Sequence, residues 1–283
     1  MAKIEDFNTG QTPVWCPGCG NFGILMAVRS ALAELNIKRE NTLIVSGIGC
    51  SDKYNQYVNT YAFESIHGRI LPVAMGARLA NYNLKVVCIG GDGDGYGIGM
   101  CHFVHAARRN LNLTYIVCDN QIYGLTTGQT SPTSDKGFKT KSTPNGNIEM
   151  PVNPLTIALS AGATYVARGF AGDVATLKEL IKGGIQHNGF AVIDVFQPCV
   201  TFNYKNTYEW FNAKLYKLGE DHDTSSKEMA FKRANESEKL PIGLFYKEDK
   251  PTYEDEALPA KAKPLVEQDI SNVNVDDLMD ELM

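Results

Sequence analysis

The sequence predicts an α/β fold with a doubly wound, mostly parallel sheet. Segments rich in β-branched residues alternate with segments whose apolar residues recur at helical spacing, a pattern typical of parallel sheets covered by helices. The clearest strand is 85–89, a Lys-Val-Val-Cys-Ile run that ends in two glycines. With 283 residues, 43% of them hydrophobic and 21% charged, the chain is long enough for one large α/β domain or two small ones.

The elements can be placed in chain order from their apolar spacing. A helix is expected over 21–35, because Leu25, Val28 and Leu32 fall on one face. Another is expected over 72–81, with Pro72 in the first turn, where its missing N–H costs little. Two further helices are expected at 97–109 and 174–185, and strands at 43–45, 85–89, 113–118, 165–167 and 191–196.

Two parts of the chain carry no helical or strand period. Residues 124–154 are rich in Thr, Ser, Pro, Gly and Lys, and so long a segment is expected to be functional or to contact a partner. Beyond residue 204 the composition becomes charged, and the chain ends in an acidic cluster, Asp276, Asp277, Asp280 and Glu281. We therefore expect a domain over 1–204 and an irregular C-terminal extension over 205–283, which wraps a partner or stays partly disordered.

Charge and cysteine content narrow the class of protein. A net charge of −5 and a pI near 5.6 argue against nucleic acid as a partner. No stretch approaches 18 consecutive apolar residues and the first ten residues lack an apolar core, so we expect no membrane contact and a cytoplasmic location. Seven cysteines in such a chain are unsuited to a disulfide framework, which leaves metal or cluster ligation open.

The segment 90–95 reads Gly-Gly-Asp-Gly-Asp-Gly and directly follows the strand 85–89. Glycines there let backbone N–H groups approach a phosphate, and the following helix adds the positive end of its dipole. Asp92 and Asp94 would repel a bare phosphate, unless a divalent cation such as Mg²⁺ lies between them. The loop therefore suggests a metal-bridged diphosphate. The alternative is a glycine-rich turn with two solvated carboxylates.

Asn120 stands 28 positions after Asp92, at the end of the next strand. Neighbouring parallel strands bring their carboxyl ends together, so Asp92 and Asn120 could share one ion. Gly-Asp-Gly followed by Asn at this spacing resembles the motif of thiamine-diphosphate enzymes. That resemblance implies that Asp92, the Asn120 side chain and the Ile122 carbonyl bind Mg²⁺, while Gly93 and Asp94 lie against the diphosphate. A dinucleotide site fits less well, because the glycines lack the G-x-G-x-x-G spacing.

Four cysteines could hold either Zn²⁺ or a [4Fe–4S] cluster. Cys16 and Cys19 form a C-x-x-C pair, and Cys50 and Cys199 follow strands. A thioredoxin-like redox pair is the alternative, but no strand precedes Cys16. The other three are expected to be small core residues, namely Cys88, Cys101 and Cys118.

Taken together, these motifs resemble the beta subunits of 2-oxoacid:ferredoxin oxidoreductases over about residues 10–250. The segments that carry the resemblance are 16–19 (Cys-Pro-Gly-Cys), 47–51 (Gly-Ile-Gly-Cys-Ser), 67–69 (His-Gly-Arg), 91–94 (Gly-Asp-Gly-Asp), 123–129 (Tyr-Gly-Leu-Thr-Thr-Gly-Gln) and Cys199. The resemblance implies a thiamine-diphosphate-binding fold and the oxidative decarboxylation of a 2-oxo acid, such as pyruvate or 2-oxoglutarate. Coenzyme A would take the acyl group, and electrons would pass through one [4Fe–4S] cluster on the four cysteines to ferredoxin.

The same resemblance assigns roles to single residues. The expected cofactor-binding set is Ile48, Gly49, Cys50, Ser51, His67, Gly68, Gly91, Asp92, Gly93, Asp94, Asn120, Ile122, Gly124 and Leu125. His67 could donate to a diphosphate oxygen, and Lys53 could pair with the substrate carboxylate. A structural histidine and a solvated lysine are the alternatives. Leu125 corresponds to a position near the substrate.

No segment matches a motif for the carboxylate that activates thiamine, which the family's alpha subunit supplies. We therefore expect a chain that is inactive alone and works with an alpha subunit, or alpha plus gamma, as a heterodimer or dimer of heterodimers. Two other interpretations stay open. One is a non-redox thiamine enzyme component, such as a decarboxylase or an acetolactate synthase-like subunit with structural zinc, and the other is a noncatalytic scaffold subunit.

Overall fold

A computed structural model describes residues 2–257, 263–269, 271 and 274–281. The strands are β1 (Thr42–Ser46), β2 (Tyr61–Glu64), β3 (Lys85–Gly91), β4 (Leu113–Asp119), β5 (Tyr165–Phe170), β6 (Phe190–Phe196), β7 (Leu215–Lys217) and β8 (Leu240–Lys247). The longer helices are α1 (Asn21–Glu34), α3 (Ile70–Ala80), α4 (Met100–Arg109), α5 (Pro154–Ala161), α6 (Val174–Gln186), α7 (Tyr208–Lys214) and α8 (Lys227–Ala234). Short helical turns include η3 (Cys50–Asp52), the π-type η4 (Gly93–Ile98), α2 (Tyr54–Tyr57), α9 (Tyr253–Ala257) and α10 (Asp276–Asp280).

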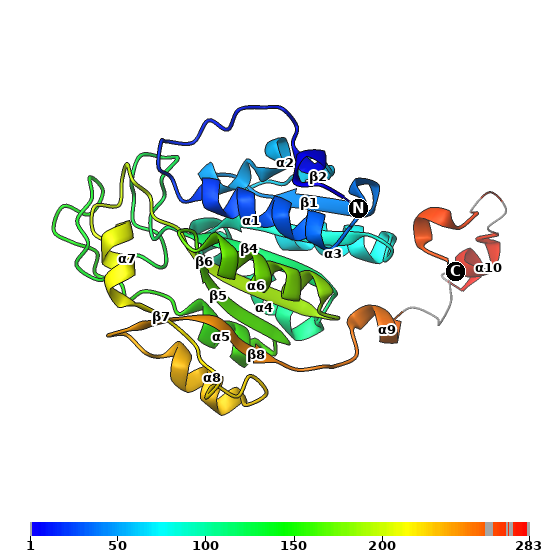
Figure 1. Ribbon diagram of the computed structural model, residues 1–283. Helices are drawn as coiled ribbons and strands as arrows, with labels where there is room; N and C mark the ends of the chain where they lie inside the picture. Colours follow the sequence, from blue (N-terminus) through cyan, green and yellow to red (C-terminus); the bar gives the residue numbers. More distant parts are fainter. Residues whose placement is uncertain (1, 258–262, 270, 272–273, 282–283) are drawn as a thin grey trace.

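The strands form one sheet in the order β2-β1-β3-β4-β6-β5-β8-β7. Every neighbouring pair is parallel except β5 and β8, so the expected doubly wound, mostly parallel sheet is confirmed. Helices α1 and α6 cover one face, and α3, α4 and α5 cover the other (Figure 1). Strands buried on both faces explain why the central segments read as continuous apolar runs. Within the described residues, no helix is long and apolar enough to cross a membrane.

Local boundaries differ from the sequence prediction where single residues break a period. The helix expected over 97–109 begins only at Met100, as α4. Residues 97 and 98 belong to η4, where Gly97 has non-helical φ and ψ of −89° and −111°. Helix α3 begins at Ile70, which makes Pro72 its third residue, still inside the first turn. Strand β2 and helix α5 were not predicted. All four residues of β2 are exposed, so the strand lacks the apolar alternation that would reveal it.

The chain after residue 204 is more regular than the sequence suggested. Strand β8 pairs antiparallel with β5, and β7 extends the sheet beyond it. Phe245 of β8 and Ala230 of α8 are fully buried in the core. The sheet therefore crosses the expected boundary at 204 and 205, and the partner-contacting role of 205–283 stays a prediction. Parts of that expected extension, 258–262, 270, 272–273 and 282–283, lie outside the described residues.

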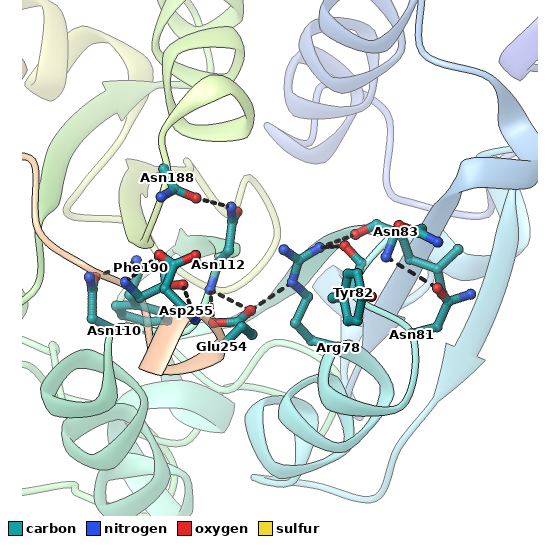
Figure 2. Close-up of polar contacts among 12 residues, drawn as sticks. Arg78, Asn81, Tyr82, Asn83, Asn110, Asn112, Asn188, Phe190, Glu254 and Asp255 are labelled. Carbon is teal, nitrogen blue, oxygen red and sulfur yellow. Dashed lines mark hydrogen bonds and ion pairs between the residues drawn. The ribbon is translucent and has the colours of Figure 1, made fainter. Parts of the chain in front are cut away.

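A buried ion pair fastens helix α9 to the end of the sheet where the strands begin (Figure 2). Arg78 Nε of α3 lies 2.7 Å from Glu254 Oε1, and the Glu254 side chain is only 6% exposed. The backbone N–H of Asn112, which precedes β4, donates to the same oxygen at 3.1 Å. Arg78 Nη1 donates to the carbonyl oxygens of Tyr82 and Leu84. Hydrogen bonds to the backbone thus support both partners of the ion pair.

Candidate functional site

A cavity of about 510 Å³ opens at the carboxyl ends of β1, β3 and β4. Its lining includes every expected cofactor-binding residue except Gly68: Ile48, Gly49, Cys50, Ser51, His67, Gly91, Asp92, Gly93, Asp94, Asn120, Ile122, Gly124 and Leu125. The other lining residues were not predicted: Asp52, Tyr123, Thr126, Gln129 and Thr130. A volume of this size suits a cofactor-sized ligand. The position is where ligands bind in doubly wound sheets.

The turn between β3 and η4 requires glycine at position 93. A Cβ built there would lie 2.1 Å from Tyr123 Cε1, a contact that no side chain can make. The Tyr123 hydroxyl also donates to the Gly93 carbonyl oxygen at 3.1 Å. Tyr123 therefore packs directly on the glycine loop and holds its backbone against the cavity.

Asp92 is buried beside the cavity without a Lys or Arg partner among the described residues. The Ser131 hydroxyl donates to Asp92 Oδ2, and Thr133 Oγ1 donates to the same oxygen at 2.6 Å. Burial raises the pKa of Asp92 to about 6, while these two hydrogen bonds oppose the rise. Ser131 and Thr133 belong to the irregular segment 124–154, so part of that segment serves to hold Asp92.

Asp94 joins two walls of the cavity. Its Oδ2 accepts hydrogen bonds from the backbone N–H groups of Gly68, at 3.0 Å, and Ile48, at 3.3 Å. His67 Nδ1 lies 3.1 Å from the same oxygen and 3.2 Å from the Ile48 carbonyl oxygen. Gly68 therefore contributes through Asp94 rather than by lining the cavity. A Cβ at Gly47 would lie 2.2 Å from Asp94 Oδ2, which explains the glycine there.

The placement of Asn120 beside Asp92 follows from the sheet. Strands β3 and β4 pair in parallel register with Gly91 opposite Cys118, so the residues after each strand end meet at the same edge. Asn120 Oδ1 accepts from the Ile122 N–H at 3.1 Å, and Asn120 Nδ2 donates to Gln197 Oε1 at 3.1 Å. Asp92 and Asn120 both line the larger cavity, and a shared ion stays a prediction.

A second cavity, of about 250 Å³, contains all four of the cysteines expected to act together. Cys16 and Cys19 approach it from the turn before α1, Cys50 from η3 after β1, and Cys199 from the segment after β6. A Cβ at Gly124 would lie 3.6 Å from Cys199 Sγ and 3.8 Å from Cys50 Sγ. Of the other three cysteines, Cys88 and Cys118 are buried as expected. Cys101 is exposed on α4, so its assignment to the core was wrong.

Polar donors surround the cysteines in this cavity. Gln197 Nε2 donates to Cys19 Sγ at 3.3 Å, and the Nδ2 group of the fully buried Asn21 has no hydrogen-bond partner among the residues that the structure describes. Burial raises the pKa of Cys19 to about 12, and its proximity to Cys199 and Cys50 adds to the rise. Four thiolates could exist here only with a positive centre between them. Among the described residues, no three His, Cys, Asp or Glu side chains converge on a single-ion site.

The two cavities share a wall. Cys50, Asn120, Gly124 and Leu125 line both. Lys53 lines only the cysteine cavity, and Leu125 is exposed at the junction. A ligand in the larger cavity would therefore lie against the cysteine cavity, separated from it by single side chains.

The chain is similar to known oxidoreductases in both structure and sequence. The structure matches 2-oxoglutarate:ferredoxin oxidoreductase from Magnetococcus marinus with a TM-score of 0.92 and 41% identity, over 99% of this chain and 96% of that one. The 2-oxoacid:ferredoxin oxidoreductase 1 subunit beta of Aeropyrum pernix is 47% identical over 89% of this chain and 83% of its own. The 2-oxoglutarate synthase subunit KorB of Methanocaldococcus jannaschii is 38% identical over 86% of this chain and 90% of its own.

Family models agree with these relatives. The C-terminal TPP-binding domain of thiamine pyrophosphate enzymes matches residues 47–195, and the C-terminal part of the pyruvate ferredoxin oxidoreductase beta subunit matches 199–262. The fold is thus that of a thiamine pyrophosphate enzyme. The chain belongs to the beta subunits of 2-oxoacid:ferredoxin oxidoreductases, which confirms the resemblance seen in its motifs.

Proposed function

We propose that the larger cavity holds thiamine diphosphate with Mg²⁺ and that Cys16, Cys19, Cys50 and Cys199 hold one [4Fe–4S] cluster. With an alpha subunit, the chain would convert a 2-oxo acid and coenzyme A to acyl-CoA and CO₂, with ferredoxin as electron acceptor. The shared wall of the two cavities carries this proposal, because it would bring the reacting carbon and the electron acceptor together.

The residues present fit a metal-bridged diphosphate. Asp92 and Asn120 offer a carboxylate and an amide oxygen, and the Ile122 carbonyl could complete the protein ligands of Mg²⁺. A cation would also offset the buried charge of Asp92, which has no Lys or Arg partner among the described residues. The backbone of Gly91 and Gly93, together with His67, would face the diphosphate.

The second cavity fits a cluster better than zinc. A single zinc ion draws its sulfur ligands to about 2.3 Å, whereas the cavity that these four cysteines help to line has a volume of about 250 Å³. The unpartnered Asn21 Nδ2 group and the Gln197 amide are donors of the kind that sulfur atoms of a cluster accept. The relatives' names likewise favour the redox enzyme over a non-redox thiamine enzyme.

Thiamine diphosphate, when bound, supplies the carbon nucleophile and the electron sink needed for decarboxylation. The chain's own residues hold and orient the reactants. Leu125, which lines both cavities, would form an apolar wall for the substrate side chain. Lys53 lines the cysteine cavity, so it would pair with a substrate carboxylate that extends past Leu125 into that cavity. The neighbour from Magnetococcus marinus was solved with 2-oxoglutarate, coenzyme A and succinyl-CoA bound, so 2-oxoglutarate is a first substrate to test, beside pyruvate.

The carboxylates of the cavity have other tasks, which supports the need for a partner. Asp52 accepts the Gly47 N–H at 2.9 Å, Asp94 joins two walls, and Asp92 is the proposed Mg²⁺ ligand. The alpha subunit, or alpha plus gamma, would therefore supply the activating carboxylate, in a heterodimer or a dimer of heterodimers.

Metal analysis of anaerobically purified protein tests the cluster. We expect iron and acid-labile sulfide to approach four each per chain, together with a brown colour. Replacement of Cys199 by Ser should reduce both, whereas replacement of the exposed Cys101 should not. Stoichiometric zinc in a colourless protein would contradict the proposal.

Dye reduction tests the partner. Expressed alone, the chain should reduce no viologen when given 2-oxoglutarate or pyruvate with coenzyme A, and co-expression with an alpha subunit should restore the activity. A chain ending at Ala257 keeps helix α9 and its buried ion pair, so it should retain the cluster spectrum but bind the partner more weakly. Full activity of the isolated chain would contradict the partner argument.

A further inference from the structure

Gln197 is the first residue after strand β6, and its side-chain amide contacts a residue of each proposed cofactor site. We infer that Gln197 is a positioning residue that serves both: it orients Asn120 toward Mg²⁺ and donates a hydrogen bond to the cluster ligand Cys19. The inference rests on the proposed function, because it presumes Mg²⁺ at Asn120 and a cluster at the cysteines.

The Gln197 side chain is fixed in place. It is 1% exposed, and its own backbone N–H donates to the Asp119 carbonyl oxygen at 2.9 Å. A Cβ at Gly20 would lie 2.8 Å from Gln197 Cγ, so the turn before α1 packs closely on this side chain. An amide held this tightly has little rotamer freedom to lose when it forms its hydrogen bonds.

The hydrogen bonds fix which end of each amide faces which way. The Pro198 carbonyl oxygen can only accept, so the group 3.1 Å from it must be the Gln197 amide nitrogen, Nε2. The Gln197 oxygen then faces Asn120 and can only accept, so Asn120 presents its own nitrogen there at 3.1 Å. Asn120 Oδ1 is thereby turned to the other side, where it accepts the Ile122 N–H. That oxygen is the proposed Mg²⁺ ligand.

The second N–H of Gln197 Nε2 points to Cys19 Sγ, 3.3 Å away. A hydrogen bond to a ligating thiolate stabilises negative charge on the cluster, and the reduced cluster carries more of it. Gln197 should therefore make the cluster easier to reduce. The two contacts use different atoms of the same amide, so different substitutions can separate them.

Two substitutions and a matched control test the inference in the complex with the alpha subunit. Gln197→Glu retains an acceptor for Asn120 Nδ2 but removes the donor to Cys19. Gln197→Met has a similar length and removes both interactions. Gln186→Met makes the same chemical change at an exposed glutamine at the end of α6. The measurements are the cluster midpoint potential, from a redox titration followed by electron paramagnetic resonance, and the Mg²⁺-dependent affinity for thiamine diphosphate, from calorimetry.

We expect both Gln197 variants to have a more negative midpoint potential than the wild-type complex. Only Gln197→Met should also lose affinity for the Mg²⁺ cofactor, by about 10-fold or more, as is typical when the partner of a metal ligand is removed. Gln186→Met should change neither. Unchanged potential and affinity in Gln197→Met with an intact cluster would overturn the inference, as would a lower melting temperature alone. A wild-type complex without iron would instead refute the proposed function.

Discussion

Two groups of buried carboxylates among the described residues differ in their partners. At the carboxyl ends of the strands, Asp52, Asp92 and Asp94 line one cavity, and no Lys or Arg pairs with them among the described residues. Deeper in the body and at the opposite end of the sheet, Asp194 pairs with Arg168 at 2.9 Å and Glu254 with Arg78 at 2.7 Å. The paired acids stabilise the scaffold, whereas the unpaired ones leave a charge for a ligand to neutralise.

The largest effect should follow from removing an unpaired acid. Asp92→Ala should abolish Mg²⁺-dependent binding of thiamine diphosphate, because the diphosphate would lose the cation that bridges it to the protein. Calorimetric titration in the presence of Mg²⁺ measures this, with Glu254→Gln as a control that should bind normally. Unchanged affinity would mean that the Gly-Asp-Gly loop has another purpose.

Removing a paired acid should instead lower stability. Glu254→Ala leaves Arg78 buried without its carboxylate, and we expect a loss of about 3 kcal/mol in the free energy of unfolding. The double variant Arg78→Met, Glu254→Leu should lose less stability than Glu254→Ala, because no charge is then left unpaired. Urea denaturation measures both. Weaker cofactor binding in Glu254→Ala would show that the two regions are not independent.

Gly47→Ala should disturb the cavity through a steric effect. The new Cβ would lie 2.2 Å from Asp94 Oδ2 and would displace the carboxylate that accepts the Ile48 and Gly68 N–H groups. We expect the free energy of unfolding to fall by about 1–3 kcal/mol and the cofactor to bind more weakly. Gly76→Ala on α3 is the matched control, because no atom of the described residues lies within 4 Å of a Cβ there. It should leave binding unchanged and stability equal or slightly higher.

The smallest effect concerns pH, where Asp92 and the buried His187 should act in opposite directions on the cofactor-free chain. Burial raises the pKa of Asp92 from 3.8 to about 6, so the folded state binds more protons and stability falls as pH rises through this range. Burial lowers the pKa of His187 from 6.5 to about 4, so stability falls as pH drops from 6.5 to 4.

Replacing either Asp92 or His187 should therefore leave the pH dependence of stability that the other residue contributes. Relative to the wild type, Asp92→Asn should make stability more sensitive to acid, and His187→Gln should make it less sensitive. The difference in slope should not exceed about 1.4 kcal/mol per pH unit for one proton. Thermal unfolding between pH 4.5 and 7 measures these slopes. If stability changed equally with pH in the wild type and both variants, the opposite pKa shifts of Asp92 and His187 would be contradicted.

Sequence patterns predicted the parts of the site that are local in the chain. Gly91 to Asp94 and Cys16 to Cys19 are contiguous motifs, and Asn120 could be placed because parallel strands end side by side. Ser131 and Thr133 escaped prediction, since they reach Asp92 from the irregular segment 124–154 and have no spacing that reveals them. Asp52 of η3 escaped because its hydrogen bond from the Gly47 N–H exists only in the folded loop. Gln197 escaped for the same reason. Its role depends on two partners that lie far from it in sequence, Cys19 and Asn120.

The fold shows the same division between local and long-range information. The five strands β1, β3, β4, β5 and β6 could be predicted from their continuous apolar runs. Strand β2 is exposed at an edge of the sheet, and β8 can be recognised only from its pairing with β5. The charged composition after residue 204 concealed Phe245, whose burial depends on helices α5 and α8 closing over it. Composition describes a segment on average and does not show which of its residues are buried.

Cys50 lines both cavities, and Cys16, at the rim of the cysteine cavity, is exposed to solvent. In the proposed holoenzyme, molecular oxygen could reach the cluster from the Cys16 side, and damage there would also move a wall of the thiamine site. Air would then inactivate two sites in one event, and added cofactor alone would not rescue the enzyme. We expect such a protein to depend on an environment poor in oxygen, unless a partner subunit covers Cys16.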